Sequence, residues 1–279
     1  MVRDLSQHLG SCSINTATLG FQAPIGEVID AVARAGFGVI APWRREVEGN
    51  DVKLIAKHIG DAGLALSGYC RSTYIPALDA QSFRTNIESN KRALDDAATL
   101  GAPCFVMVVG SLPAGSKDLA AARRQVKEAS AELVEYGHKV GVKIALEPLH
   151  PVYAADRSCL TLLSEALDWC DEIDDPWIGV AIDCYHVWWD PHLIRDIARA
   201  KNRIFAYHVC DWLVPTTDVL NDRGMMGDGV IDLKAIRSAV ETAGYAGAVE
   251  VEIFSSGNWW KRSMAETLAV CRERFLTST

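Results

Sequence analysis

The sequence predicts a single (β/α)₈ barrel over residues 1–279, the TIM-barrel fold of the α/β class with a parallel eight-stranded core. Three observations lead to this prediction. Short β-like runs alternate with helical segments to the end of the chain, there are eight such runs, and no linker or break in composition divides them. The length of 279 residues also suits one barrel, for which about 250 residues are typical.

The eight predicted strands are short runs, most of them rich in Val, Ile and aromatic residues, which favour extended backbone. They are 11–15, 37–43, 64–70, 104–110, 142–148, 178–184, 203–210 and 248–254. An open doubly wound sheet is the alternative. Its first strand normally leads into a Gly-rich phosphate-binding turn, and INTATLG at 14–20 is not one.

Helices are predicted between the strands from apolar spacing and capping residues. In 25–36, apolar residues recur on one helical face. Asp190 is expected to cap a helix that has Pro191 in its first position and three apolar residues facing inward, Leu193, Ile194 and Ile197. The last helix is expected to open with a capping box at 263–266.

Composition excludes several classes of function. The formal net charge of −8 makes a nucleic-acid backbone an unsuitable partner. The sequence contains no apolar run of the roughly 20 residues that a membrane span needs, and its first residues do not resemble a signal peptide. The eight cysteines form no CxxC pair. We therefore expect a cytoplasmic protein with reduced, buried cysteines.

Four consecutive predicted strands end in residues that commonly bind metals. These residues are Glu147, Asp183, His208 and Glu252. In a barrel of this class the active site lies at the carboxyl ends of the strands. Alternation along each strand turns these four side chains toward the barrel axis and the bulky neighbours toward the helices. One acid at a strand end is usually a loop cap or a surface ion pair, but four adjacent strand ends are hard to explain in that way.

Three carboxylates and an imidazole in one barrel mouth would repel each other unless a cation lay among them. A single divalent ion is the simplest answer. Oxygen-rich ligands favour Mn²⁺, with Mg²⁺ or Co²⁺ as alternatives, over a thiolate-bound structural zinc. Four protein ligands leave two open positions on an octahedral ion, which the carbonyl and hydroxyl oxygens of a sugar could fill.

The chain resembles the xylose-isomerase-like barrels of the sugar phosphate isomerase/epimerase family, which includes tagatose epimerase, hydroxypyruvate isomerase and inosose dehydratase. The resemblance spans nearly the whole chain. It rests on five motifs: ALEPLHP (145–151), VAIDCYH (180–186), AYHVCDW (206–212), DRGMMGDGVID (222–232) and GYAGAVEVEIF (244–254).

The resemblance implies that Glu147, Asp183, His208 and Glu252 are the metal ligands. It further implies that Glu147, Glu252 and His186 are catalytic, and that His186 and Arg223 contact the substrate. This sequence departs from tagatose-type epimerases at one position. A second carboxylate usually follows the strand-five Glu by six residues, but here that position is Tyr153, with His150 and Asp156 nearby. His150 is therefore a further candidate for substrate contact.

The implied reaction begins with removal of a proton from a carbon next to a carbonyl, through an enediolate. Return of the proton gives an isomerase or epimerase of keto sugars. Loss of a leaving group would instead give a lyase, such as a deglycosidase acting on a 3-keto-glycoside or a dehydratase acting on an inosose. The expected partner is a small sugar or glycoside. A homo-oligomer or an accessory subunit would also be compatible.

Six of the eight tryptophans follow strand ends on the predicted active face, where indole rings suit sugar C–H faces. We take Trp43, Trp189, Trp212 and Trp260 as candidate substrate contacts, with ordinary packing as the alternative for each. Three arginines, Arg44, Arg45 and Arg71, also follow strand ends, and for them we favour solvation at the surface over binding of an anion.

Two other classes remain to be weighed. A DNA-repair endonuclease of the same superfamily would need several zinc ions and a basic groove, which seven histidines and a net charge of −8 do not favour. A non-catalytic sugar-binding barrel would be expected to keep the tryptophans and lose a metal ligand. All four ligands are present, so the enzyme is favoured.

Overall fold

A computed structural model describes residues 2–5 and 8–279. In these residues, nine parallel strands form one sheet in the order β3-β2-β1-β11-β8-β7-β6-β5-β4. Their bounds are β1 (Cys12–Asn15), β2 (Val39–Ala41), β3 (Ala65–Leu66), β4 (Tyr69–Cys70), β5 (Cys104–Met107), β6 (Lys143–Leu146), β7 (Ile178–Asp183), β8 (Ile204–Val209) and β11 (Val249–Val251).

The nine strands occupy eight positions of a barrel, as the sequence predicts. Each predicted run contains a strand, and the third run, 64–70, is divided at Ser67 and Gly68 into β3 and β4. Because β3 pairs with β2 while β4 pairs with β5, this one segment joins the two ends of the sheet. The open doubly wound alternative is therefore wrong.

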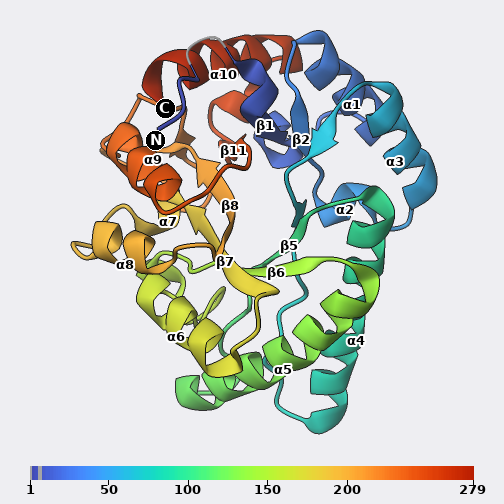
Figure 1. The fold of residues 1–279 in the computed structure, drawn as a ribbon, viewed down its shortest axis with the longest axis vertical. Coiled ribbons are helices and arrows are strands. Elements are labelled where there is room, and N and C mark those ends of the chain that lie inside the picture. Colours follow the sequence, from blue (N-terminus) through green and yellow to red (C-terminus); the bar gives the residue numbers. More distant parts are fainter. Residues whose placement is uncertain (1, 6–7) are drawn as a thin grey trace.

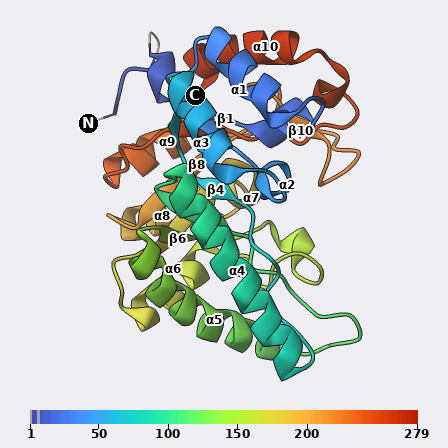
Figure 2. The ribbon, with the colours of Figure 1, turned by 90° about the vertical axis from the view of Figure 1, so that its right-hand side faces the viewer.

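Eight of the helices in the described residues follow the strands in turn and surround them (Figure 1). They are α1 (Ile25–Arg34), α3 (Val52–Asp61), α4 (Ala80–Leu100), α5 (Leu119–Val140), α6 (Leu163–Ile173), α8 (Leu193–Arg199), α9 (Leu233–Thr242) and α10 (Met264–Ser278). Figure 2 shows the two longest, α4 and α5, lying side by side. No helix of the described residues is long and apolar enough to cross a membrane.

Short elements decorate the connections at the carboxyl ends of the strands. Two are one-turn α-helices, α2 (Arg44–Val47) and α7 (Cys184–Val187). A two-stranded antiparallel ribbon joins β9 (Asp211–Trp212) to β10 (Arg223–Gly224). The 3₁₀ turns are η1 (Leu9–Ser11), η2 (Thr16–Leu19), η3 (Pro151–Tyr153) and η4 (Trp259–Lys261).

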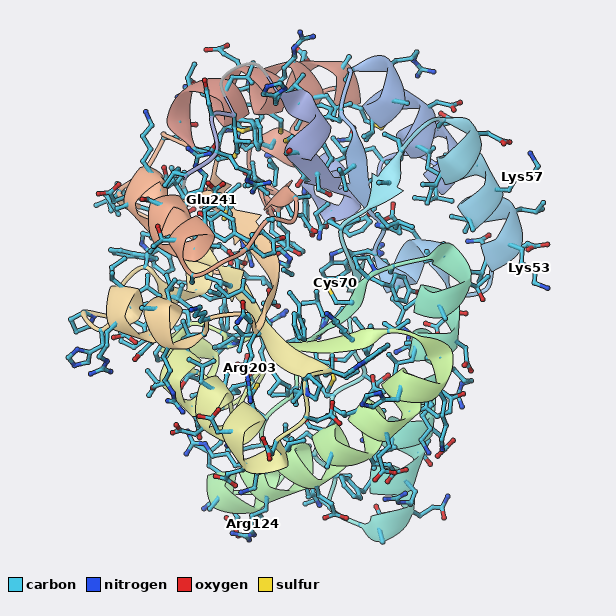
Figure 3. The ribbon with its side chains drawn as sticks, viewed as in Figure 1. Lys53, Lys57, Cys70, Arg124, Arg203 and Glu241 are labelled. Carbon is cyan, nitrogen blue, oxygen red and sulfur yellow. The ribbon has the colours of Figure 1, made fainter. Side chains whose placement is uncertain are left out.

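The core has two parts because side chains alternate along each strand. In β7, the bulky residues Ile178, Val180 and Ile182 join the large cluster between the strands and the helices. Ala181 instead points into the barrel, where it meets Ala145 on β6, together with Ala206 and Cys70. Figure 3 shows Cys70 in the middle of the ring, whereas Lys53, Lys57 and Arg124 lie at its outer edge. The small inward residues leave the barrel mouth free for polar groups.

Most helix caps agree with the sequence, and one does not. Ser263 and Glu266 form the predicted capping box of α10. Helix α8 begins at Leu193 rather than Pro191, because the Asp190 carboxylate accepts from the His192 amide and holds a turn there instead. As a result Ile194 is 53% exposed, so its predicted inward orientation is wrong.

Candidate metal centre

Four side chains meet at the carboxyl ends of four neighbouring strands. Glu147 follows β6, Asp183 ends β7, His208 lies in β8 and Glu252 follows β11. All four are buried, and one ligand atom of each lies within 4.8 Å of the others. Alternation along the strands, which turns each side chain toward the axis, accounts for the cluster that the sequence predicts.

The atoms of this cluster suit a divalent cation. His208 Nδ1 lies 3.2 Å from Glu147 Oε1 and 3.8 Å from Glu252 Oε2. Within the described chain, neither His208 Nδ1 nor Glu147 Oε1 has a hydrogen-bond partner, although both are buried. Burial raises the pKa of Glu252 to about 8, although His208 and Arg223 oppose it. Buried lone pairs aimed at one point are what a metal ion would satisfy.

A second carboxylate layer supports the cluster from below. Glu250 Oε1 lies 3.5 Å from His208 Nε2, the ring nitrogen that faces away from Glu147. Glu250 accepts hydrogen bonds from Asn15 Nδ2 at 2.8 Å and from Ser67 Oγ at 2.6 Å. His208 Nε2 makes no hydrogen bond within the described chain, so Glu250 acts on the ring through its charge. A carboxylate this close to a ligating imidazole raises its basicity.

Two neighbouring strand residues differ in their relation to Glu250. Lys143 is exposed, and its ammonium lies 4.8 Å from the Phe205 ring rather than beside Glu250. Asn15 was not singled out, although it ends the first predicted strand. Its Nδ2 bridges the two carboxylate layers because it also donates to Glu252 Oε1 at 3.0 Å.

His186 reaches the cluster because α7 begins directly after Asp183. Asp183 Oδ1 caps this turn by accepting from the Tyr185 amide at 2.9 Å, while Oδ2 faces the site. His186 Nε2 then lies 3.6 Å from Asp183 Oδ2. Burial lowers the pKa of His186 to about 3, so the ring is neutral.

Arg223 is the buried cation that borders the cluster. Its Nη1 donates to Asp183 Oδ2 at 2.9 Å and to Glu252 Oε2 at 3.3 Å. Its Nη2 lies 3.2 Å from His186 Nε2. Arg223 therefore links two ligand candidates to the neutral imidazole, and the β9–β10 ribbon carries it there.

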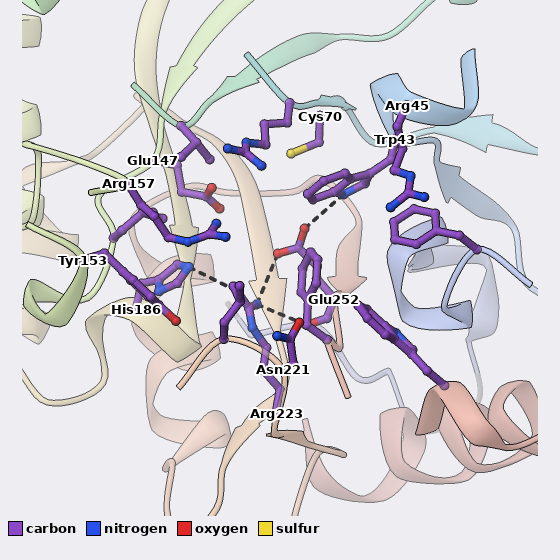
Figure 4. A pocket seen from close by; sticks show the side chains of 17 residues that line it. Trp43, Arg45, Cys70, Glu147, Tyr153, Arg157, His186, Asn221, Arg223 and Glu252 are labelled. Atoms are coloured by element: carbon purple, nitrogen blue, oxygen red, sulfur yellow. Dashed lines mark hydrogen bonds and ion pairs between the residues drawn. The ribbon is translucent and has the colours of Figure 1, made fainter. Parts of the chain in front are cut away.

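A pocket of about 290 Å³ opens above these residues (Figure 4). Its lining includes Glu147, Glu252, His186 and Arg223. Five aromatic residues form part of its walls: Phe21, Trp43, Tyr153, Phe254 and Trp260. Ligand pockets commonly start at about 300 Å³, so this one suits a small molecule. Trp43 also touches the cluster, because its Nε1 donates to Glu252 Oε1 at 3.4 Å.

The structure brings only some of the predicted substrate contacts to this pocket. Trp43 and Trp260 line it, but His150, Trp189 and Trp212 do not. Instead the His150 ring stacks on Trp212 at 5.0 Å between centroids and meets Trp189 edge-on at 5.7 Å. His150 thus contacts both tryptophan rings outside the pocket lining, an arrangement of the packing type that we gave as the alternative for each tryptophan.

Two pocket arginines differ from expectation and one was not considered. Arg45 and Arg71, which we expected to be solvated at the surface, line the pocket together with Arg157. Arg44 turns away and donates to Thr73 and Glu48. For Arg71, its position directly after a strand end was the sequence signal that could have indicated a place in the pocket. Nothing comparable marks Arg157, which follows the η3 turn.

The chain belongs to the xylose isomerase-like TIM barrel family, whose model matches residues 29–274. Curated relatives include an inosose isomerase of Bacillus velezensis, 26% identical over 78% of this chain and 81% of its own. A ketose 3-epimerase of Arthrobacter globiformis is 25% identical, and the match covers 82% of this chain and 77% of the epimerase. A 3-dehydroshikimate dehydratase of Pseudomonas putida is 24% identical over 86% of this chain but 38% of its own. The family is thus one of enzymes.

Solved structures agree with this assignment. The crystal structure of protein SMc04130 from Sinorhizobium meliloti 1021 has a TM-score of 0.95 and 50% identity, and it covers 97% of this chain and 99% of that one. The structure of the IOLI protein with a binding zinc atom has a TM-score of 0.81 and 20% identity, and the match covers 95% of this chain and 96% of that one. The second likeness shows the fold alone.

Proposed function

We propose that the protein is a divalent-metal-dependent isomerase or epimerase of a small keto sugar or keto polyol. The observation that carries the proposal is the buried cluster of Glu147, Asp183, His208 and Glu252 under an aromatic pocket. The relatives named inosose isomerase and ketose 3-epimerase support this reaction class. Three oxygen donors and one nitrogen favour Mn²⁺, although the IOLI structure holds zinc.

A bound divalent ion would polarise the substrate carbonyl and stabilise the negative charge that develops on its oxygen. The carboxylates of Glu147 and Glu252 then supply the proton transfers. Glu252 is held in place by Asn15 Nδ2 at 3.0 Å and Trp43 Nε1 at 3.4 Å, so one of its oxygens is oriented before substrate arrives. A preoriented carboxylate is what abstraction of a proton next to a carbonyl requires.

Arg223 and His186 are placed to bind the reacting oxygens. Arg223 is fixed by Asp183 and Glu252, and its Nη2 lies 3.2 Å from His186 Nε2. A neutral imidazole can donate or accept a hydrogen bond while an enediolate forms, without adding another charge to the pocket. We therefore assign His186 to the substrate hydroxyl or carbonyl and keep the carboxylates as the bases.

Elimination is the second candidate, because the abstracted proton can be followed by loss of water. The likeness to a 3-dehydroshikimate dehydratase over 86% of this chain supports it. The pocket of about 290 Å³ suits a single ring better than a glycoside with a large aglycone. An inosose or a related cyclic ketone is therefore a better dehydratase substrate than a 3-keto-glycoside.

The test is solvent exchange by the Mn²⁺-loaded enzyme. Ketoses, inososes and 3-keto-glycosides are incubated in D₂O, and NMR follows deuterium at the carbon next to the carbonyl and any loss of water. Exchange with at least one ketose or inosose supports the proposal, and exchange followed by an unsaturated product selects the dehydratase. Metal-loaded protein that exchanges none of them contradicts both reactions.

A further inference from the structure

Three of the pocket arginines have no acidic partner. The guanidinium groups of Arg45, Arg71 and Arg157 make no hydrogen bond or ion pair with any residue in the described part of the chain. Many other arginines of this protein do have carboxylate partners, for example Arg84 with Glu132. In a chain with 36 acidic and 28 basic residues, pocket arginines left without such partners require an explanation.

Aromatic rings hold these arginines in place instead. The Arg45 guanidinium lies 3.9 Å from the centroid of the Phe21 ring. The Arg71 guanidinium lies 4.7 Å from that of Tyr74. For Arg157 and Tyr153 the distance is 5.7 Å. Stacking on a ring orients a guanidinium while its N–H groups remain available to a ligand.

Two acids outside the pocket lining that interact electrostatically with Arg45 and Arg157 are hydrogen-bonded to other groups. Glu46 interacts electrostatically with Arg45, but its carboxylate accepts a hydrogen bond from Thr16. Asp218, which interacts similarly with Arg157, accepts from the Leu220 and Asn221 amides. The positive charge of these arginines is therefore directed at the pocket rather than used within the protein.

Two of the three arginines lie on either side of one strand. Arg71 directly follows β4 and Arg157 lies in the connection after β6, and both of these strands pair with β5. Val108, just beyond the end of β5, lines the pocket as well. Arg45 enters from the connection after β2, and Figure 4 shows it on the opposite side of the pocket from Arg157.

We propose that the substrate carries one anionic group, a carboxylate or a phosphate, which Arg71 and Arg157 bind while its reacting carbonyl lies at the four-residue cluster. A guanidinium with free N–H donors can bind the oxygens of either anion in bidentate geometry, and both residues line the pocket. This inference rests on the proposed function. It narrows the keto sugar or polyol to a sugar acid or a sugar phosphate. Arg45 adds positive charge at the rim.

Equilibrium binding tests this proposal without turnover. Because Trp43 and Trp260 line the pocket, tryptophan fluorescence can follow titrations with a 2-keto sugar acid, a ketose phosphate and the matched neutral ketose. The wild-type protein should bind at least one anionic ligand roughly 10-fold or more tightly than the neutral one, the usual scale for charge-assisted hydrogen bonds. Comparison of the two anions distinguishes carboxylate from phosphate.

Variants locate the effect. Arg71→Gln and Arg157→Gln should each weaken anion binding roughly 10-fold and affect neutral-ketose binding much less, so that the preference for the anion falls. Arg71→Lys and Arg157→Lys, which keep the charge, should recover part of the loss and replace any Gln variant that fails to fold. Arg124→Gln is the matched control, because Arg124 lies on α5 at the outer edge of the ring.

The outcomes separate this inference from the proposed function. Wild-type protein with no preference for an anion, or Gln variants that bind the anion as well as wild type does, would overturn it. If D₂O exchange occurs with neutral ketoses alone, the inference fails and the proposed function stands. If anions bind through Arg71 and Arg157 but no ligand exchanges deuterium, the anion site stands and the proposed reaction fails.

Discussion

Glu250 Oε1 lies 3.5 Å from His208 Nε2, on the opposite edge of the imidazole from Glu147 and Glu252. Two glutamates of one strand segment thus face the same histidine at different depths. Glu252 contributes to the metal-ligand cluster, whereas Glu250 supports the ring from behind. Their roles can be separated by the same substitution at each position.

Glu252→Gln should abolish activity and greatly weaken Mn²⁺ affinity, because it removes both a ligand charge and a base. Glu250→Gln should lower metal affinity by roughly 10–100-fold, the scale seen when the partner of a ligating histidine is lost, and keep residual turnover at saturating metal. Metal titration and initial rates measure both effects. The opposite ranking would mean that Glu250, not Glu252, is the ligand.

His186→Ala should keep the metal and lose turnover by roughly 10²-fold or more, the scale seen when a positioned hydrogen-bond donor to a developing oxyanion is removed. His186 contacts Asp183 and Arg223 but lies outside the four-residue cluster. Metal analysis and single-turnover rates of the same preparation check this. A variant that loses its metal would make His186 a ligand.

Trp260→Ala should raise KM with little change in kcat, because Trp260 lines the pocket. Trp189→Ala is the matched control. Its ring packs on His150 and its Nε1 donates to the His186 carbonyl oxygen at 2.8 Å, outside the pocket lining. It should lower thermal stability and leave KM unchanged. Equal effects of the two substitutions on KM would remove the distinction between pocket and packing tryptophans.

Removal of the metal should destabilise the fold. A site occupied at 100 times its Kd contributes about 2.7 kcal/mol to the free energy of unfolding. For a chain of this size that corresponds to a Tm lower by roughly 5 °C after chelation. Calorimetry with and without a chelator measures it. Glu147→Gln should melt at the same temperature in both conditions, and a chelator effect of wild-type size in that variant would place the ion elsewhere.

The barrel and the cluster could be predicted because they depend on local patterns. Alternation within β7 separates Ile182, which faces the helices, from Asp183, which faces the axis. Parallel strands then bring their carboxyl ends to one side of the sheet, so a single ligand type at each end is enough to assemble the site.

The pocket walls could not be predicted in the same way, because they depend on how connections fold against one another. Trp189 also follows a strand end on the active face, as Trp43 does, but the α7 turn carries it to His150 instead. Arg157 reaches the pocket only because the connection after β6 turns through η3. The spacing of residues along the sequence predicts the course of neither connection.

The most direct test of the central claim is deuterium exchange measured together with metal content. Wild-type protein and Asp183→Asn are each chelated, reloaded with Mn²⁺, and incubated with ketose and inosose in D₂O. We predict about one ion per wild-type chain, exchange that disappears on chelation and returns on reloading, and loss of both metal and exchange in Asp183→Asn. Exchange that persists in chelated, metal-free protein would contradict the claim that these four residues act through a bound divalent ion.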